Sequence, residues 1–124
     1  MYIEFEPGQK HAAKGAEVSE SPDAFTDCGY LLEENEVVID IDSISKDQIK
    51  AAIKAFGIDT QVIWTTRGAH LYFSKPLGFN RGKNGVCALG FEIETKHKKN
   101  TPRGITVKRG GVLREVEGEG LWWK

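Results

Sequence analysis

Two aspartates on one predicted strand are the residues of this sequence best suited to hold a metal ion. Residues 36–42, Glu-Val-Val-Ile-Asp-Ile-Asp, place Asp40 and Asp42 on one face of a strand, because strand side chains alternate. Asp is depleted from strands, and two carboxylates on one face repel each other unless a cation lies between them. Mg²⁺ or Mn²⁺ is the natural cation, since hard cations take carboxylate oxygens. The alternative is an exposed strand end that leads into a helix cap.

The segment Thr-Thr-Arg-Gly-Ala-His at residues 65–70 has the residue types of an anion site. A glycine in a tight turn can free backbone N–H groups for an anion, and Arg67 can fork onto a phosphate, with Thr66 beside it. His70 shares one strand face with Tyr72. Leu71 and Phe73 share the opposite face, which we expect to face the core. A structural histidine is the alternative interpretation.

Two glutamates form another pair of carboxylates on one strand face. Glu92 and Glu94 alternate with Phe91 and Ile93. Either glutamate could complete a three-carboxylate cluster with the two aspartates. The alternative is a solvent-facing edge strand, where Glu–Lys pairs across strands are common.

The charge is strongly segregated along the chain, although the net charge is only −1. Residues 1–48 have a charge of −9, residues 49–114 a charge of +10, and residues 115–124 a charge of −2. A basic middle favours a polyanionic partner, unless the blocks fold against one another. The candidate nucleic-acid contacts lie in a basic loop over 96–104 and along a following hairpin: Lys96, His97, Lys98, Lys99, Arg103, Arg109 and Arg114.

The elements that must position these residues form an α+β fold. A helix is predicted over 45–56, because Ser45 and Gln48 form a capping box and apolar residues recur with helical spacing. Gly110-Gly111 predicts a hairpin turn. The expected strands are residues 2–5, 36–42, 61–65, 70–73, 86–95, 105–108 and 112–115, with a loop over 77–85. The order predicts a compact, RRM-like mixed or antiparallel sheet with few helices, partly covered by the N-terminal segment.

Length and composition limit the classes of protein to which this chain can belong. The chain has 124 residues, 40% hydrophobic and 28% charged, which is typical of one globular domain. It has no apolar run long enough for a membrane span and no signal peptide, so we expect a cytoplasmic protein without a membrane partner. Cys28 and Cys87 are expected to be buried free thiols. Trp122 and Trp123 need a surface to pack on, either this domain's own sheet or the rest of a longer protein.

Taken in order, these motifs resemble the archaeo-eukaryotic primase superfamily, and more narrowly the primase-polymerase domain of phage and plasmid replication proteins. The matching motifs are D-x-D at 40–42, T-x-R-G-x-H-L-Y-F at 65–73 and an acid after Gly90-Phe91. Gly29-Tyr30-Leu31-Leu32 is similar to the family's lead into the first motif. The similarity covers roughly residues 28–116, and the family's Pro-rich stretch after the third acid is missing.

The resemblance implies a minimal catalytic core over residues 1–124, either complete or the N-terminal fragment of a longer replication protein. It implies that Asp40, Asp42 and Glu92 are catalytic and hold Mg²⁺ or Mn²⁺, with Glu94 as a rival because the family's third acid is usually Asp. It implies that His70 binds the triphosphate, with Arg67 and Thr66 as helpers. The reaction would be two-metal phosphoryl transfer from NTP or dNTP on a single-stranded DNA template, in partnership with a replicative helicase domain or protein.

Three other functions remain open on sequence grounds. A metal-dependent nuclease would use the same carboxylates and ignore free nucleotides. A non-catalytic RRM-like module would stack bases on Trp64, Tyr72 or Phe73. A catalytically inactive member of the superfamily would bind nucleotides without transferring them.

Overall fold

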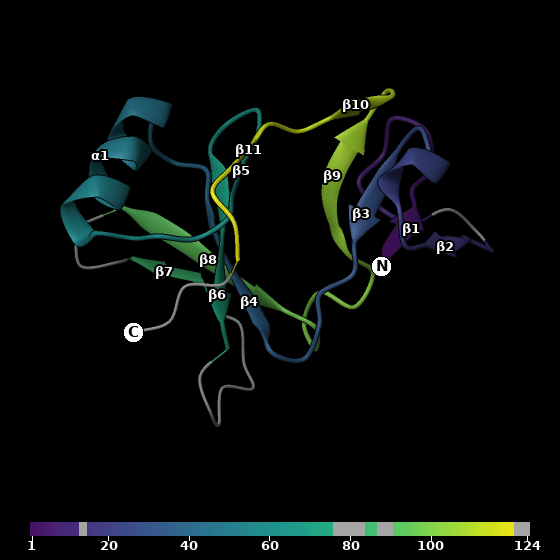
Figure 1. The fold of residues 1–124 in the computed structure, drawn as a ribbon, viewed down its shortest axis with the longest axis horizontal. Coiled ribbons are helices and arrows are strands. Elements are labelled where there is room, and N and C mark those ends of the chain that lie inside the picture. The colour runs from purple at the N-terminus through teal and green to yellow at the C-terminus, as the bar shows by residue number, and fades with distance from the viewer. Residues whose placement is uncertain (13–14, 76–83, 87–90, 121–124) are drawn as a thin grey trace.

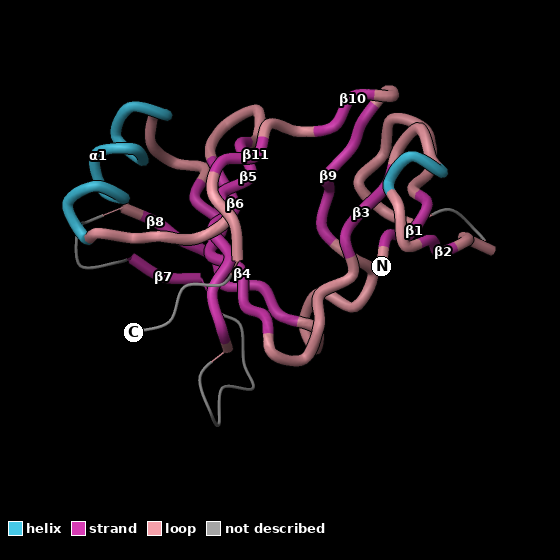
Figure 2. The backbone as a smooth tube through the Cα atoms, viewed as in Figure 1, coloured by secondary structure: helices cyan, strands magenta, loops and turns pink. Residues whose placement is uncertain are grey.

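The chain folds into two antiparallel β-sheets that face each other, with one α-helix on the outer side of the larger sheet (Figure 1). The computed structural model describes residues 1–12, 15–75, 84–86 as backbone only, and 91–120. Figure 2 shows how strands dominate both halves of this fold. The α+β class with few helices is therefore confirmed.

The larger, six-stranded sheet contains both motifs singled out in the sequence. Its order is β11-β5-β6-β4-β8-β7. In that order the strands are Val116–Glu117, Val62–Trp64, Ala69–Ser74, Glu36–Ile41, Glu92–His97 and Asn84–Val86. The central strand β4 pairs with β6 on one side and with β8 on the other, so the aspartate strand has the histidine strand and the glutamate strand as its neighbours.

The smaller, five-stranded sheet is built from the two ends of the described chain. Its order is β10-β9-β3-β1-β2. In that order the strands are Val112–Leu113, Ile105–Arg109, Cys28–Tyr30, Tyr2–Glu4 and Val18–Ser19, and a 3₁₀ turn η1 spans Pro22–Ala24. Gly110 and Gly111 both have positive φ between β9 and β10, which confirms the predicted hairpin turn.

Helix α1, Lys46–Phe56, begins and ends where the sequence predicts. Ser45 and Gln48 make both bonds of the capping box, and Gly57 closes the helix in the left-handed conformation. The helix packs on the outer face of the six-stranded sheet, where Ile49 is completely buried. We call the buried residues at this contact the helix-side cluster: Ile41, Ile49, Val62, Trp64, Ala69 and Leu71. No helix in the described part of the chain is long and apolar enough to cross a membrane.

A second apolar cluster joins the inner faces of the two sheets. Cys28, Ile105 and Val107 of the five-stranded sheet pack with Val38 and Tyr72 of the six-stranded sheet. The polar residues next to this cluster, on the same inner face, are therefore enclosed between the sheets. The N-terminal segment does cover the six-stranded sheet as expected, by forming three strands of the opposing sheet.

The largest differences from the predicted strands lie in residues 84–97. Residues 86–95 are not one strand: Asn84–Val86 form β7, although residues 84 and 85 were predicted in a loop, and Val86 pairs with Glu92 of the separate strand β8. Lys96 and His97, predicted in a loop, are the last residues of β8, because the ladder with β4 continues to Val37. The predictions for residues 76–83, Cys87, Trp122 and Trp123 lie outside the described residues.

Candidate functional site

The register of the six-stranded sheet brings Asp40, His70 and Glu94 into one row across three strands. Asp40 is the direct partner of His70 in β6 and of Glu94 in β8. All three side chains point to the inner face, because they share strand parity with buried Val38 and Tyr72. The side chain of Asp40 is only 14% exposed and that of His70 only 10% exposed. This row is the foundation of the candidate site.

The turn between β5 and β6 lies directly against the end of β4. A Cβ atom on Gly68 would lie 1.6 Å from the carbonyl oxygen of Ile41 and 2.8 Å from the Cα of Asp42. Only glycine allows so close an approach, and this approach places the Arg67 turn beside the two aspartates. The N–H of Gly68 itself is not available to an anion, because it donates to the side chain of Thr65 at 2.9 Å.

These motifs line one cavity of about 180 Å³ between the sheets. From the six-stranded sheet and its turn come Asp40, Asp42, Thr65, Thr66, Arg67, His70 and Lys96. The opposing side contributes Lys10, Gly104, Ile105, Thr106 and Arg109, and Arg114 comes from the connection between β10 and β11. We call this space the cation cavity, because its described lining holds five Lys or Arg side chains and only two carboxylates. The structure brings the two predicted aspartates together with Thr66, Arg67 and His70 in this lining.

Lys96 is the cation closest to the buried aspartate. Its Nζ lies 3.7 Å from Asp40 Oδ2 and 4.0 Å from Glu94 Oε1. Burial raises the pKa of Asp40, and the charge of Lys96 opposes that rise. Lys96 was predicted as a nucleic-acid contact, and the structure instead places it between two acidic side chains inside the site.

His70 is held in its neutral form. Burial, aided by the nearby charges of Lys96, Arg114 and Lys10, lowers its pKa to about 3. Its Nε2 lies 3.5 Å from Asp40 Oδ1, while its Nδ1 is buried without a hydrogen-bond partner among the described residues. A neutral imidazole has one N–H donor and one acceptor, so His70 can still offer a hydrogen bond to a ligand in the cavity.

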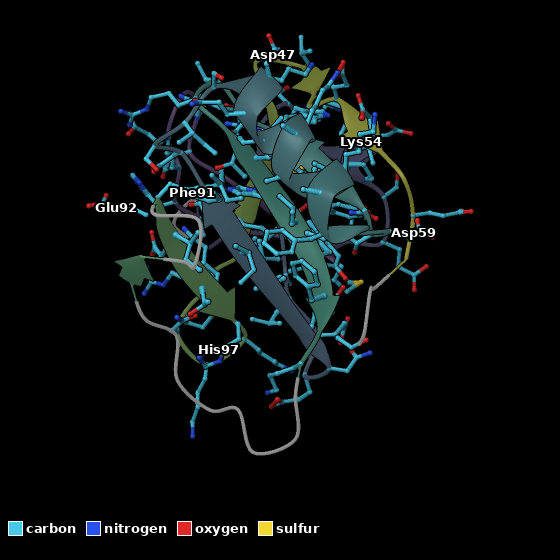
Figure 3. All side chains as sticks on the ribbon, turned by 90° about the vertical axis from the view of Figure 1, so that its left-hand side faces the viewer. Asp47, Lys54, Asp59, Phe91, Glu92 and His97 are labelled. Carbon is cyan, nitrogen blue, oxygen red and sulfur yellow. The ribbon has the colours of Figure 1, made fainter. Side chains whose placement is uncertain are left out.

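The third predicted carboxylate does not reach the cation cavity. Glu92 is exposed and is absent from the described lining. In Figure 3 its side chain lies at the margin of the molecule and points outward. Glu94 is the nearer candidate, because it is the cross-strand partner of Asp40, but its side chain is half-exposed and is held by Lys96.

The carboxylates that do line the cavity fit an ion that arrives with a ligand. In the residues that the structure describes, no three His, Cys, Asp or Glu side chains are grouped closely enough to hold a metal. Mg²⁺, however, is usually bound through one or two carboxylates together with substrate phosphates and waters. Asp40 and Asp42 therefore suit a divalent ion shared with a phosphate group better than a metal site made of protein alone.

The remaining predicted contacts divide between the cavity and the outer surface, except His97, which is only 1% exposed at the end of β8, so its prediction as a nucleic-acid contact was wrong. Lys98, Lys99 and Arg103 are exposed and do not line the cavity, although Gly104 at the end of their loop does. Lys10 and Thr106 line it but were not predicted. Nothing in the sequence near Lys10 indicated a strand or helix that would direct it toward the aspartates.

Two of the aromatic residues considered for base stacking are buried in the cores. Trp64 is 6% exposed on the helix side, and Tyr72 is 2% exposed between the sheets. Phe73 is half-buried and packs on the helix-side cluster. An open stacking platform for single-stranded nucleic acid is therefore not formed by these side chains. Cys28 is a buried free thiol as predicted, and burial raises its pKa.

No known protein family, curated protein or solved structure matches this chain.

Proposed function

We propose that this chain is a metal-dependent nucleotidyltransferase of the primase-polymerase type, which uses NTP or dNTP to make or extend primers on single-stranded DNA. The observation that supports this proposal best is the lining of the cation cavity. Two carboxylates suited to a divalent ion lie there beside a neutral histidine and an excess of cations. A nucleoside triphosphate with its metal ion complements both charges.

The cations would bind the phosphates and neutralise the charge that leaves with pyrophosphate. Arg67 is exposed at the turn and can place its planar fork on two phosphate oxygens. Arg109 and Arg114 approach from the opposite side of the cavity, so a phosphate chain would be gripped from two directions. The neutral His70 would donate a hydrogen bond to a phosphate oxygen from Nδ1, in the tautomer that carries its single N–H there and not on Nε2 beside Asp40.

The two aspartates would hold a Mg²⁺ or Mn²⁺ ion that comes with the triphosphate. When bound, this ion would supply charge neutralisation at the reacting phosphate and lower the pKa of the attacking 3′-hydroxyl. Asp40 must release Lys96 to take part. The freed ammonium group then becomes a further phosphate contact, so that ligand binding exchanges one partner of Lys96 for another.

Calorimetric titration of the purified chain with GTP and dGTP, in Mn²⁺ and then in EDTA, tests this proposal. We expect binding that needs Mn²⁺, and we expect Asp42→Asn to abolish the metal dependence. Asp59→Asn is the matched control, because Asp59 is exposed beyond the C-terminal end of α1 and does not line the cavity. Unchanged binding by Asp42→Asn in a folded sample would exclude a role for the aspartate pair.

Incubation with primed and unprimed single-stranded DNA, nucleotides and Mn²⁺ then tests the transfer step. Longer or newly made strands, lost in Asp40→Asn, would support the primase-polymerase function. Shortened strands without nucleotide use would show a nuclease instead, and triphosphate binding without any strand change would show a nucleotide-binding protein.

A further inference from the structure

A second, larger cavity lies between the two sheets next to the cation cavity. It has a volume of about 400 Å³, which lies within the usual range for small-molecule sites. We call it the tyrosine cavity, because all three tyrosines of the chain line it. The other described lining residues are Pro22, Glu36, Gln61, Ile63, Val107, Leu113, Arg114 and Val116.

The three tyrosine rings form a continuous series from one sheet to the other. The ring centroids of Tyr2 and Tyr30 are 5.6 Å apart, and those of Tyr30 and Tyr72 are 6.1 Å apart in an edge-on arrangement. Such pairs are well packed and hold their rings in fixed orientations. The cavity therefore has rigid aromatic surfaces next to the aliphatic side chains of Ile63 and Val107, which suits a flat ring system.

Two polar groups of this cavity have hydrogen-bonding capacity left over. Within the described residues, the hydroxyl of Tyr72 is buried without a partner. Glu36 is 9% exposed, and its Oε1 accepts from the Tyr30 hydroxyl and the Glu33 N–H, each at 2.7 Å. No hydrogen bond joins its Oε2 to another described residue, and this oxygen is free to accept from a ligand. Leaving the buried Tyr72 hydroxyl unsatisfied costs free energy that a ligand with a matching polar group would recover.

The tyrosine cavity and the cation cavity share a lining residue and lie next to each other. Arg114 lines both cavities. His70 lines the first and Tyr72 the second, and these residues are two positions apart on one face of β6, a spacing of about 7 Å. One ligand with an anionic end and a flat ring at the other end can therefore occupy both.

We propose that the tyrosine cavity binds the base of the nucleotide whose phosphates occupy the cation cavity, and that this base is guanine. Oε2 of Glu36 is left to accept hydrogen bonds, and it can accept from the two adjacent N–H groups that guanine presents on one edge. Adenine presents a ring nitrogen acceptor at the corresponding position, which faces the carboxylate unfavourably. The inference rests on the proposed nucleotide site, and it assigns to this chain a preference for guanine nucleotides when no template is present.

Binding of four probes without any nucleic acid tests the inference: GTP, ATP, guanosine and inorganic tripolyphosphate, each with Mn²⁺. We expect GTP to bind at least about tenfold more tightly than ATP, since a hydrogen bond to a charged group is worth about 1.5–3 kcal/mol. We also expect guanosine to bind weakly and GTP to displace it. Tripolyphosphate should bind without involving the tyrosine cavity.

Three variants locate the effect. Glu36→Gln keeps an oxygen for Tyr30 but loses the charge, so GTP should fall to the affinity of ATP. Tyr72→Phe removes only the unpartnered hydroxyl and should weaken GTP binding about fivefold. Val107→Phe fills the cavity and should abolish guanosine binding but not tripolyphosphate binding, whereas Val112→Phe, the same change at an exposed position outside the cavity, should alter neither.

The outcomes separate this inference from the proposed function. If GTP, ATP and tripolyphosphate bind equally and the three variants change nothing, the tyrosine cavity does not bind the base, and the phosphate site stands. If guanosine binds but GTP does not displace it, the two cavities do not share one ligand, and the inference is also overturned. If no probe binds the folded chain, both proposals fail.

Discussion

Replacing Gly68 with alanine tests the contact on which the whole candidate site depends. Gly68 does not have a positive φ, so its backbone conformation alone would accept alanine. On that basis the change would stabilise the fold by roughly 0.4–1 kcal/mol, because alanine restricts the unfolded chain. The structure predicts the opposite sign, since the new Cβ would lie 1.6 Å from the carbonyl oxygen of Ile41.

The size of the loss follows from the atoms involved. Both partners in the clash are backbone atoms, so either the turn or the end of β4 must move by more than an ångström. Overpacking of this kind costs typically about 1–3 kcal/mol, occasionally more. We therefore expect Gly68→Ala to lose about 2 kcal/mol or more, which lowers Tm by roughly 8 °C in a chain of this size.

Urea unfolding and nucleotide titration at low temperature would measure both consequences of the change. The folded fraction of Gly68→Ala should bind GTP poorly, because the Arg67 turn has moved away from the aspartates. Gly57→Ala is the matched control: Gly57 has φ +62° with open space around it, so that variant should lose about 1 kcal/mol and keep its binding. A Gly68→Ala protein at least as stable as the parent would refute the close approach of the turn to β4.

Three further predictions concern individual side chains. His70→Ala should weaken triphosphate binding more than monophosphate binding in calorimetric titration, and equal losses would leave His70 a structural role only. Lys96→Gln should raise the affinity for Mn²⁺ alone several-fold and lower the affinity for GTP, because Lys96 lies 3.7 Å from the Asp40 carboxylate; an unchanged Mn²⁺ affinity would exclude competition for that group. Burial raises the pKa of both Tyr30 and Tyr72, so absorbance near 295 nm should show these two phenols still protonated at pH 11 in the folded chain. The unfolded chain releases those protons from about pH 10, so the free energy of unfolding should fall as pH rises above 10, and full ionisation before unfolding would contradict the burial.

The parts of the fold that were predictable have complete local signals. Helix α1 has a capping box, an apolar face and a terminal glycine within a dozen residues, and the structure reproduces each of them. The aspartate strand alternates regularly, so the faces of Asp40 and Asp42 follow from the pattern of two residues per repeat, whereas the register that pairs Asp40 with His70 does not. Most of the residues that the six-stranded sheet contributes to the cation cavity could therefore be named from the sequence.

The parts that could not be predicted depend on contacts between distant segments. Strands β1, β2 and β3 are two or three residues long, too short for any periodicity to reveal that they form a second sheet. Glu92 and Lys96 lie on the same face of β8, yet only Lys96 reaches Asp40, because the cross-strand register sets which end of the strand faces the site. The tyrosine cavity combines residues from strands of both sheets, and no short stretch of sequence indicates it.

The connection between β10 and β11 limits how far the two sheets can separate. Leu113 ends a strand of one sheet and Val116 begins a strand of the other, and only Arg114 and Glu115 lie between them, across the top of Figure 1. Three extended residue steps reach at most about 10–11 Å, close to the ordinary spacing of packed sheets. This connection therefore sets the distance between the two sheets at this edge, and it fixes the backbone of Arg114 between them, where its side chain lines both cavities.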